Sequence, residues 1–109
     1  MASLDRLRRH RRFPFDGKVQ LLWEELGEAR HVMANCLDIS QEGLRVIMMP
    51  SIARATFLHF QIPSLNFGGT GSVRSCARHR MLHEVGIEFL GGLKWDPVRH
   101  PIPAAAAAS

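Results

Sequence analysis

From residue 17 onward, apolar and polar residues along the chain tend to alternate with a period of two. In residues 83–89, Val85, Ile87 and Phe89 share one face, while polar residues and a glycine share the other. This alternation is typical of a half-buried β-strand. Similar patterns, some less regular, bring the predicted strands to six. They cover residues 18–23, 31–38, 44–49, 56–62, 72–78 and 83–89.

Turn-forming residues separate these segments. They are Gly27-Glu28, Gln41-Glu42-Gly43, Pro50-Ser51 and the run from Gly68 to Gly71. We expect the glycine run to be a hairpin turn. Six short strands at roughly ten-residue spacing, with no amphipathic helix between them, predict an all-β fold. The expected architecture is a small six-stranded antiparallel β-barrel, because closing the sheet removes its exposed edges.

The 109 residues, of which 46% are hydrophobic, are enough for one domain with a modest core. We expect three regions. Residues 1–12 form a mobile basic arm, residues 13–92 form the barrel, and residues 93–109 form an irregular or disordered tail. Prolines and an alanine run mark this tail, and the ordered alternative for it is a short turn that buries Trp95.

Several classes of function are disfavoured. No apolar run approaches the ~18 residues that cross a bilayer, and no signal peptide is recognisable, so we expect a cytoplasmic protein without membrane insertion. Cys36 and Cys76 form no CxxC pair and are expected to be reduced thiols. His79 and His83 lack a third ligand nearby, so no metal site is predicted. No segment has the spacing of a catalytic nucleophile, and we expect no enzymatic activity.

The net charge of +4 is confined to the N-terminal arm. Its first twelve residues hold five arginines and one aspartate, whereas the remaining residues carry nine basic and nine acidic side chains. A protein that coats nucleic acid would spread its cations over a face of the fold. This distribution argues against specific nucleic-acid binding.

Two short motifs remain as candidates for chemistry. The first is Arg8-x-x-x-Arg12, directly before the predicted barrel, and the second is Asp38-x-Ser40-x-x-Gly43, between two predicted strands. Taken singly, the first is an ordinary basic arm. The second is an ordinary hairpin turn, in which Gly43 would adopt a positive φ.

In this order on an all-β chain, the two motifs resemble those of the PilZ domain family. Residues 85–89 are similar to the usual final strand of that family, and the resemblance runs from about residue 8 to residue 90. It implies a six-stranded barrel and a receptor for the bacterial second messenger cyclic di-GMP. The ligand-binding residues that it implies are Arg8, Arg12, Asp38, Ser40 and Gly43.

The ligand chemistry agrees with this assignment. Cyclic di-GMP offers two phosphates and two guanines, and the planar fork of arginine matches both groups bidentately. Asp38 is expected to accept from guanine N1–H and the exocyclic amine, while Ser40 bonds a phosphate or the guanine edge. Further contacts are expected from Arg9, Arg74 and Gly86. No cofactor besides this ligand is expected.

The resemblance leads us to expect an arm-to-barrel switch. The arginine arm would be mobile without ligand, and bound ligand would bridge it to the turn at Asp38. The output would be a new surface that acts on an effector protein, for instance in motility or biofilm control. Two alternatives stay open: a PilZ-like adaptor that works without ligand, and a small nucleic-acid-binding barrel whose affinity falls steeply with salt.

Overall fold

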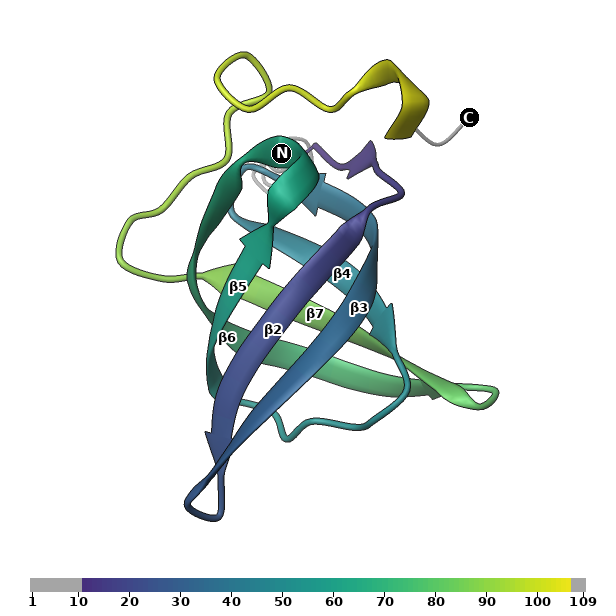
Figure 1. Ribbon diagram of the computed structural model, residues 1–109, viewed down its shortest axis with the longest axis vertical. Helices are drawn as coiled ribbons and strands as arrows, with labels where there is room; N and C mark the ends of the chain where they lie inside the picture. Colours follow the sequence, from purple (N-terminus) through teal and green to yellow (C-terminus); the bar gives the residue numbers. More distant parts are fainter. Residues whose placement is uncertain (1–10, 107–109) are drawn as a thin grey trace, which may run out of the picture.

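The computed structural model describes residues 11–106. They contain seven strands and two short 3-10 helices, joined by loops (Figure 1). The strands are β1 (Phe13–Pro14), β2 (Lys18–Glu25), β3 (Glu28–Ser40), β4 (Gly43–Met48), β5 (Phe57–Ile62), β6 (Phe67–His79) and β7 (Leu82–Phe89). The 3-10 helices are η1 (Pro63–Leu65) and η2 (Ala104–Ala106). No helix within residues 11–106 is long and apolar enough to cross a membrane.

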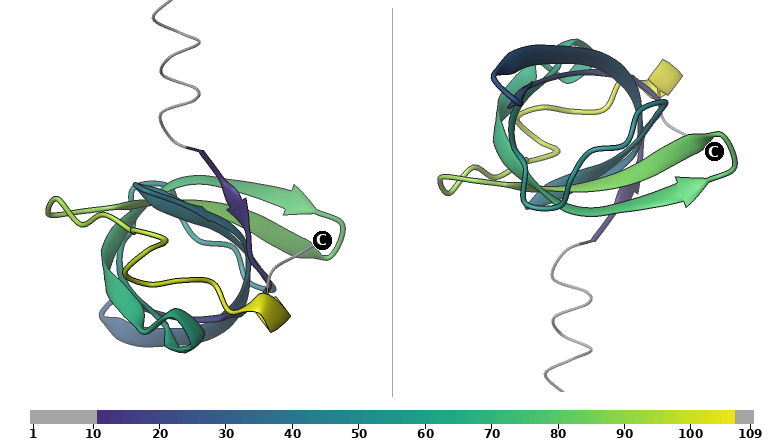
Figure 2. Two further views of the ribbon diagram at one scale, coloured as in Figure 1. Left: turned by 90° about the horizontal axis from the view of Figure 1, so that it is seen from above. Right: turned by 90° about the horizontal axis from the view of Figure 1, so that it is seen from below.

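Six of these strands close into an antiparallel barrel. The sheet order is β3-β2-β5-β6-β7-β4, and β4 pairs in turn with β3 to complete the ring (Figure 2). The prediction of an all-β, six-stranded antiparallel barrel is therefore confirmed. The seventh strand, β1, was not predicted, because two residues are too few to show alternation. It pairs with the end of β3, where Phe13 lies opposite Ile39.

The interior of the barrel holds one side chain from every second strand position. Along β7, Val85, Ile87 and Phe89 are buried, as the alternation predicts. Aromatic rings fill the centre, where Phe60 stacks on Phe89 at 5.1 Å between ring centroids. A filled interior is expected for a barrel of this size, which has room for side chains and little else. Ligand binding must therefore use its outer surface or its ends.

The expected hairpin turn at Gly68 to Gly71 is wrong. These residues lie inside β6 and pair with β5, and the reversal of direction occurs earlier, at η1 and Asn66. Asn66 takes the left-handed conformation, with φ at 52°. The glycines serve close packing, since a Cβ on Gly71 would lie 2.6 Å from Cγ2 of Ile87. Glycine occurs both in turns and where two strands pack closely, so its presence in the sequence does not distinguish a turn from a close strand contact.

The C-terminal segment, residues 93–106, runs across one open end of the barrel (Figures 1 and 2). Trp95 is 1% exposed, and its backbone N–H donates to the carbonyl of Gln41 over 2.8 Å. The Phe13 and Trp95 rings pack edge to face, with their centroids 5.3 Å apart. Farther along, the N–H of Asp16 donates to the carbonyl of Ala106 over 2.8 Å. The irregular segment thus packs against both the barrel and β1.

Candidate functional site

The two motifs of the sequence meet at an ion pair between Arg12 and Asp38. Pro14 of β1 lies opposite Asp38 of β3, so Arg12 enters the barrel surface beside this carboxylate. Nη1 of Arg12 donates to Oδ1 of Asp38 over 2.8 Å. The Arg12 side chain is 45% exposed, whereas that of Asp38 is 9% exposed. A solvent-accessible arginine therefore covers a nearly buried acid.

A second arginine, Arg45, holds the same carboxylate from the neighbouring strand. A bulge in β3 between Cys36 and Asp38 sets Asp38 directly opposite Arg45 of β4. Nε of Arg45 donates to Oδ2 of Asp38 over 2.9 Å and to Oδ1 over 3.2 Å, and its Nη2 also contacts Oδ2. The hydrogen bond to Asp38 is the main reason that the pKa of Arg45 is raised above its ordinary value. Its Nη1 donates to Glu84 over 3.1 Å.

Sequence reasoning missed Arg45. The sequence signal that could have indicated Arg45 is its position two residues after Gly43, because alternate residues of a strand share a face. Its link to Asp38 depends on the bulge in β3, which no local pattern of the sequence marks.

A hollow of about 310 Å³ lies beside these ion pairs on the outer surface of the barrel. It crosses four strands, because Ser40 pairs with Gly43, Gly43 with Glu88, Arg45 with Gly86, and Gly86 with Ser75. The residues that line it are Arg12, Ser40, Glu42, Gly43, Arg45, Arg74, Ser75, Gly86, Ile87 and Glu88. The structure thus brings together Arg12, Ser40, Gly43, Arg74 and Gly86 from the sequence prediction, with Asp38 directly beside them.

Two glycines shape this hollow. A Cβ on Gly43 would lie 2.5 Å from the backbone oxygen of Ile87, and one on Gly86 would lie 2.7 Å from Oγ of Ser75. Gly43 is the first residue of β4, and it is not among the residues with a positive φ. The expected turn conformation for Gly43 is therefore wrong. The strand needs glycine here because β7 passes too close for a side chain.

Ser40 is 2% exposed, and its hydroxyl donates to the carbonyl of Gly43 over 3.2 Å. This bond closes the short turn between β3 and β4. The serine therefore has a structural partner at the site, and its expected contact with a ligand stays a prediction.

The cations around the hollow pair with carboxylates of the barrel. Arg74 donates to Glu88 over 2.6 Å, and Lys94 contacts Glu42. Together with the pairs of Arg12 and Arg45, these contacts pair each of the cations around the hollow with a carboxylate. Most of the arm, including the predicted ligand residues Arg8 and Arg9, lies outside the described residues.

Cys36 lies beneath the site, and its Sγ donates to the carbonyl of Asp38 over 3.3 Å. Burial raises the pKa of this thiol to about 12, with the negative charge of Asp38 as the next cause. Both cysteines are free thiols, and Cys76 is half-buried. Cys36 therefore serves packing beneath Asp38, because a thiol with this pKa is a poor nucleophile at neutral pH.

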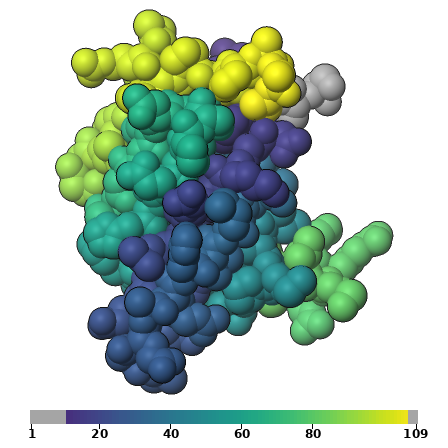
Figure 3. Space-filling view, in the orientation of Figure 1, coloured from purple at the N-terminus to yellow at the C-terminus, as the bar shows by residue number. Residues whose placement is uncertain are grey.

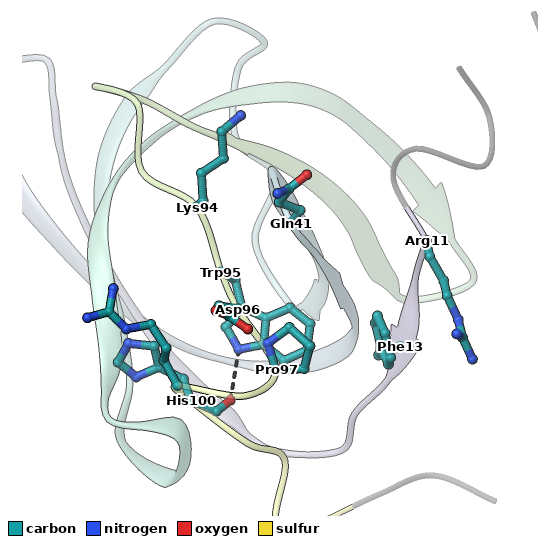
Figure 4. Close-up of a pocket in the computed structure, with 9 residues that line it drawn as sticks. Arg11, Phe13, Gln41, Lys94, Trp95, Asp96, Pro97 and His100 are labelled. Atoms are coloured by element: carbon teal, nitrogen blue, oxygen red, sulfur yellow. Dashed lines mark hydrogen bonds between the residues drawn. The ribbon is translucent and has the colours of Figure 1, made fainter. Parts of the chain in front are cut away.

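A second hollow, of about 520 Å³, lies at the barrel end beneath the C-terminal segment (Figure 4). Arg11 and Phe13 face it from the N-terminal side, and Lys94, Asp96 and Arg99 face it from the C-terminal side. Nε1 of Trp95 donates here to the carbonyl of His100 over 2.9 Å. This bond fixes the Trp95 indole, which packs against the Phe13 ring. The two ends of the described chain are therefore packed together.

The structure is a closed six-stranded barrel with an arginine from before β1 paired to an aspartate near the end of β3. Residues 6–94 match the family model of the PilZ domain, which spans most of the chain. The chain belongs to the PilZ domain family, a family of binding domains. No match to a curated protein was found.

Proposed function

We propose that this protein is a receptor for cyclic di-GMP that relays the level of this second messenger to a partner protein. It acts by binding, with no reaction catalysed and no further cofactor. The family match supports the choice of ligand class. The family contains receptors for this nucleotide, and the two motifs associated with them are present in the sequence.

The observation that carries the proposal is the ion pair between Arg12 and Asp38. It joins the last residue of the arginine motif to the first residue of the Asp38-x-Ser40-x-x-Gly43 motif across 2.8 Å. A ligand that needs both motifs therefore has them side by side. The hollow next to this pair adds Arg45 and Arg74, so three guanidinium groups surround one surface.

The proposed binding step exchanges partners at Asp38. Arg45 already supplies hydrogen bonds to both carboxylate oxygens from within the sheet. Arg12 makes a single hydrogen bond to Asp38 and lies just before β1, outside the strands, so it is the arginine that would leave. It would turn to a phosphate or to the O6/N7 edge of a guanine, which its fork matches. The freed lone pairs of Oδ1 would then accept from guanine N1–H.

The rest of the arm would close over the bound nucleotide. The arginines at the hollow are already paired with carboxylates, so Arg8 and Arg9 would add unpaired cations, which the two ligand phosphates neutralise. Fixing the arm costs roughly 1–2 kcal/mol per backbone residue, which the charge-assisted contacts have to exceed. The ordered arm and the adjoining barrel surface would form the output for an effector protein, with motility and biofilm regulation as candidate pathways.

Isothermal titration of variants tests the assigned residues. Arg12→Ala and Asp38→Ala are expected to lose most of the affinity for cyclic di-GMP. Arg30→Ala is the matched control, because Arg30 is an exposed arginine on β3 that pairs with Glu25 away from the hollow. Retained affinity in both Arg12→Ala and Asp38→Ala would reject the proposed site, and equal loss in Arg30→Ala would show nonspecific charge attraction.

A further inference from the structure

The hairpin of β6 and β7 extends beyond the barrel wall, where its tip stands clear of the other strands (Figures 1 and 3). The pairing of β5 with β6 ends at Phe57 and Ser72, whereas β6 continues to His79. Within residues 11–106, no strand pairs with the outer edge of β6 beyond this point. The hairpin therefore presents an open sheet edge.

The backbone polar groups of this edge point to solvent at alternate residues. His79 and Leu82 are the last pair before the two-residue turn at Arg80 and Met81, and such a turn closes on a hydrogen-bonded pair. The N–H and C=O groups of Arg78 and Cys76 consequently face away from β7. No other residue in the described part of the chain hydrogen-bonds these groups.

A basic groove of about 620 Å³ runs along this edge. Its lining consists of Ser51, Ile52, Arg54, Arg74, Ser75, Cys76, Arg78 and His83 and includes no carboxylate. Arg54 and Arg78 form no ion pair with a carboxylate of the described residues, unlike the arginines of the neighbouring hollow. The groove therefore favours a negatively charged occupant.

We propose that this edge is the docking site for an extended acidic segment of the partner protein, which adds to β6 as a further strand. A polypeptide can use the free backbone groups of Arg78 and Cys76, while its carboxylates meet Arg54 and Arg78. A nucleic acid has no ladder of amides for this edge, and no Phe, Tyr or Trp side chain lines the groove to stack a base. A second copy of the chain would place arginine against arginine.

The groove adjoins the proposed ligand site, because Arg74 and Ser75 line both hollows. A partner strand in the groove would lie directly beside bound nucleotide. This inference rests on the proposed function as a receptor that acts on another protein. Its test omits cyclic di-GMP, so that its failure is distinguishable from failure of nucleotide binding.

Fluorescence anisotropy of the full chain with labelled peptides tests the docking site. A peptide of alternating Glu and Thr is expected to bind. A Glu-Pro peptide, which has the same charge but lacks every second N–H, is expected to bind at least about tenfold more weakly, as is a Lys-Thr peptide. Equal binding of the Glu-Thr and Glu-Pro peptides would overturn the proposal. So would tighter binding of a thymidine oligonucleotide at the same salt concentration.

Charge reversal locates the binding surface. Arg78→Glu and Arg54→Glu are each expected to weaken binding of the Glu-Thr peptide about tenfold. Lys18→Glu is the control, because it makes the same charge change at an exposed residue of β2 that does not line the groove. Cyclic di-GMP titration of Arg78→Glu separates the two sites and is expected to match wild type. If Lys18→Glu weakens peptide binding as much as Arg78→Glu does, the docking site is rejected.

Discussion

Nε of Arg45 donates hydrogen bonds to both carboxylate oxygens of Asp38, at 2.9 Å to Oδ2 and 3.2 Å to Oδ1. Asp38 as a whole is only 7% exposed, so this acid depends on donors from the protein. Arg45 is fixed in β4, whereas Arg12 precedes the two-residue strand β1. Asp38 therefore has one partner within the sheet and one just before β1, and the proposed binding step exchanges the second.

Arg45→Ala is expected to lower the free energy of unfolding by about 1–3 kcal/mol, because it leaves the nearly buried carboxylate of Asp38 short of donors. Arg12→Ala is expected to cost less than about 1 kcal/mol, since Arg12 makes a single hydrogen bond to Asp38 and Arg45 still serves both oxygens. Urea unfolding of the two variants measures the difference. A larger loss in Arg12→Ala than in Arg45→Ala would contradict this division of roles.

The two glycines of the hollow should respond differently to alanine. Gly43→Ala is expected to cost about 1–3 kcal/mol of stability, because its Cβ would meet the backbone oxygen of Ile87 and force β4 and β7 apart. In Gly86→Ala, the added Cβ meets only the hydroxyl of Ser75, which is the movable end of a side chain, so a smaller loss of stability is expected.

Adding Ser75→Ala to each glycine variant provides the control. In urea unfolding, it is expected to reduce the destabilisation by Gly86→Ala and to leave that by Gly43→Ala unchanged. Equal rescue of both variants would show that the contact with Ile87 is not what excludes a side chain at Gly43.

The buried thiol of Cys36 predicts a loss of stability at alkaline pH. Burial raises its pKa in the folded protein from 9.0 to about 12, so between these values the unfolded chain releases a proton that the folded chain retains. Stability is therefore full below pH 9.0 and falls as the pH rises toward 12. Urea unfolding across this pH range should show a shallower fall in the free energy of unfolding for Cys36→Ala than for wild type. Identical pH profiles would refute the assignment.

The C-terminal segment is expected to contribute to the stability of the barrel, although residues after 94 lie beyond the family match. Trp95→Ala should lower the free energy of unfolding by about 3–5 kcal/mol, because it removes a buried indole and its contact with Phe13. Val98→Ala, at an 84% exposed position of the same segment, is the control. Equal unfolding midpoints for the two variants would mean that the segment does not stabilise the barrel.

The strands were predictable because a barrel imposes one strict rule, in which alternate side chains enter the core. Residues 83–89, predicted from period two, correspond to β7 at Leu82–Phe89. The glycine run was misassigned because glycine serves turns and close strand contacts alike. Only the pairing of β6 with β5 shows which of these applies.

The site was predictable only where its residues belong to contiguous motifs. Arg12, Ser40 and Gly43 line one hollow because β1 and β4 both pair with the end of β3. Arg45 was missed because its partnership with Asp38 is a contact between strands that a bulge sets in register. The burial of Trp95 likewise depends on chain segments that are distant in sequence.

Isothermal titration of the full chain with cyclic di-GMP, at moderate salt and up to tens of micromolar ligand, tests the central claim most directly. A cyclic di-GMP receptor gives saturable heat, with a defined stoichiometry that persists as the salt concentration is raised modestly. No heat over this range would contradict the receptor function and leave the ligand-independent adaptor and the small nucleic-acid-binding barrel as the alternatives.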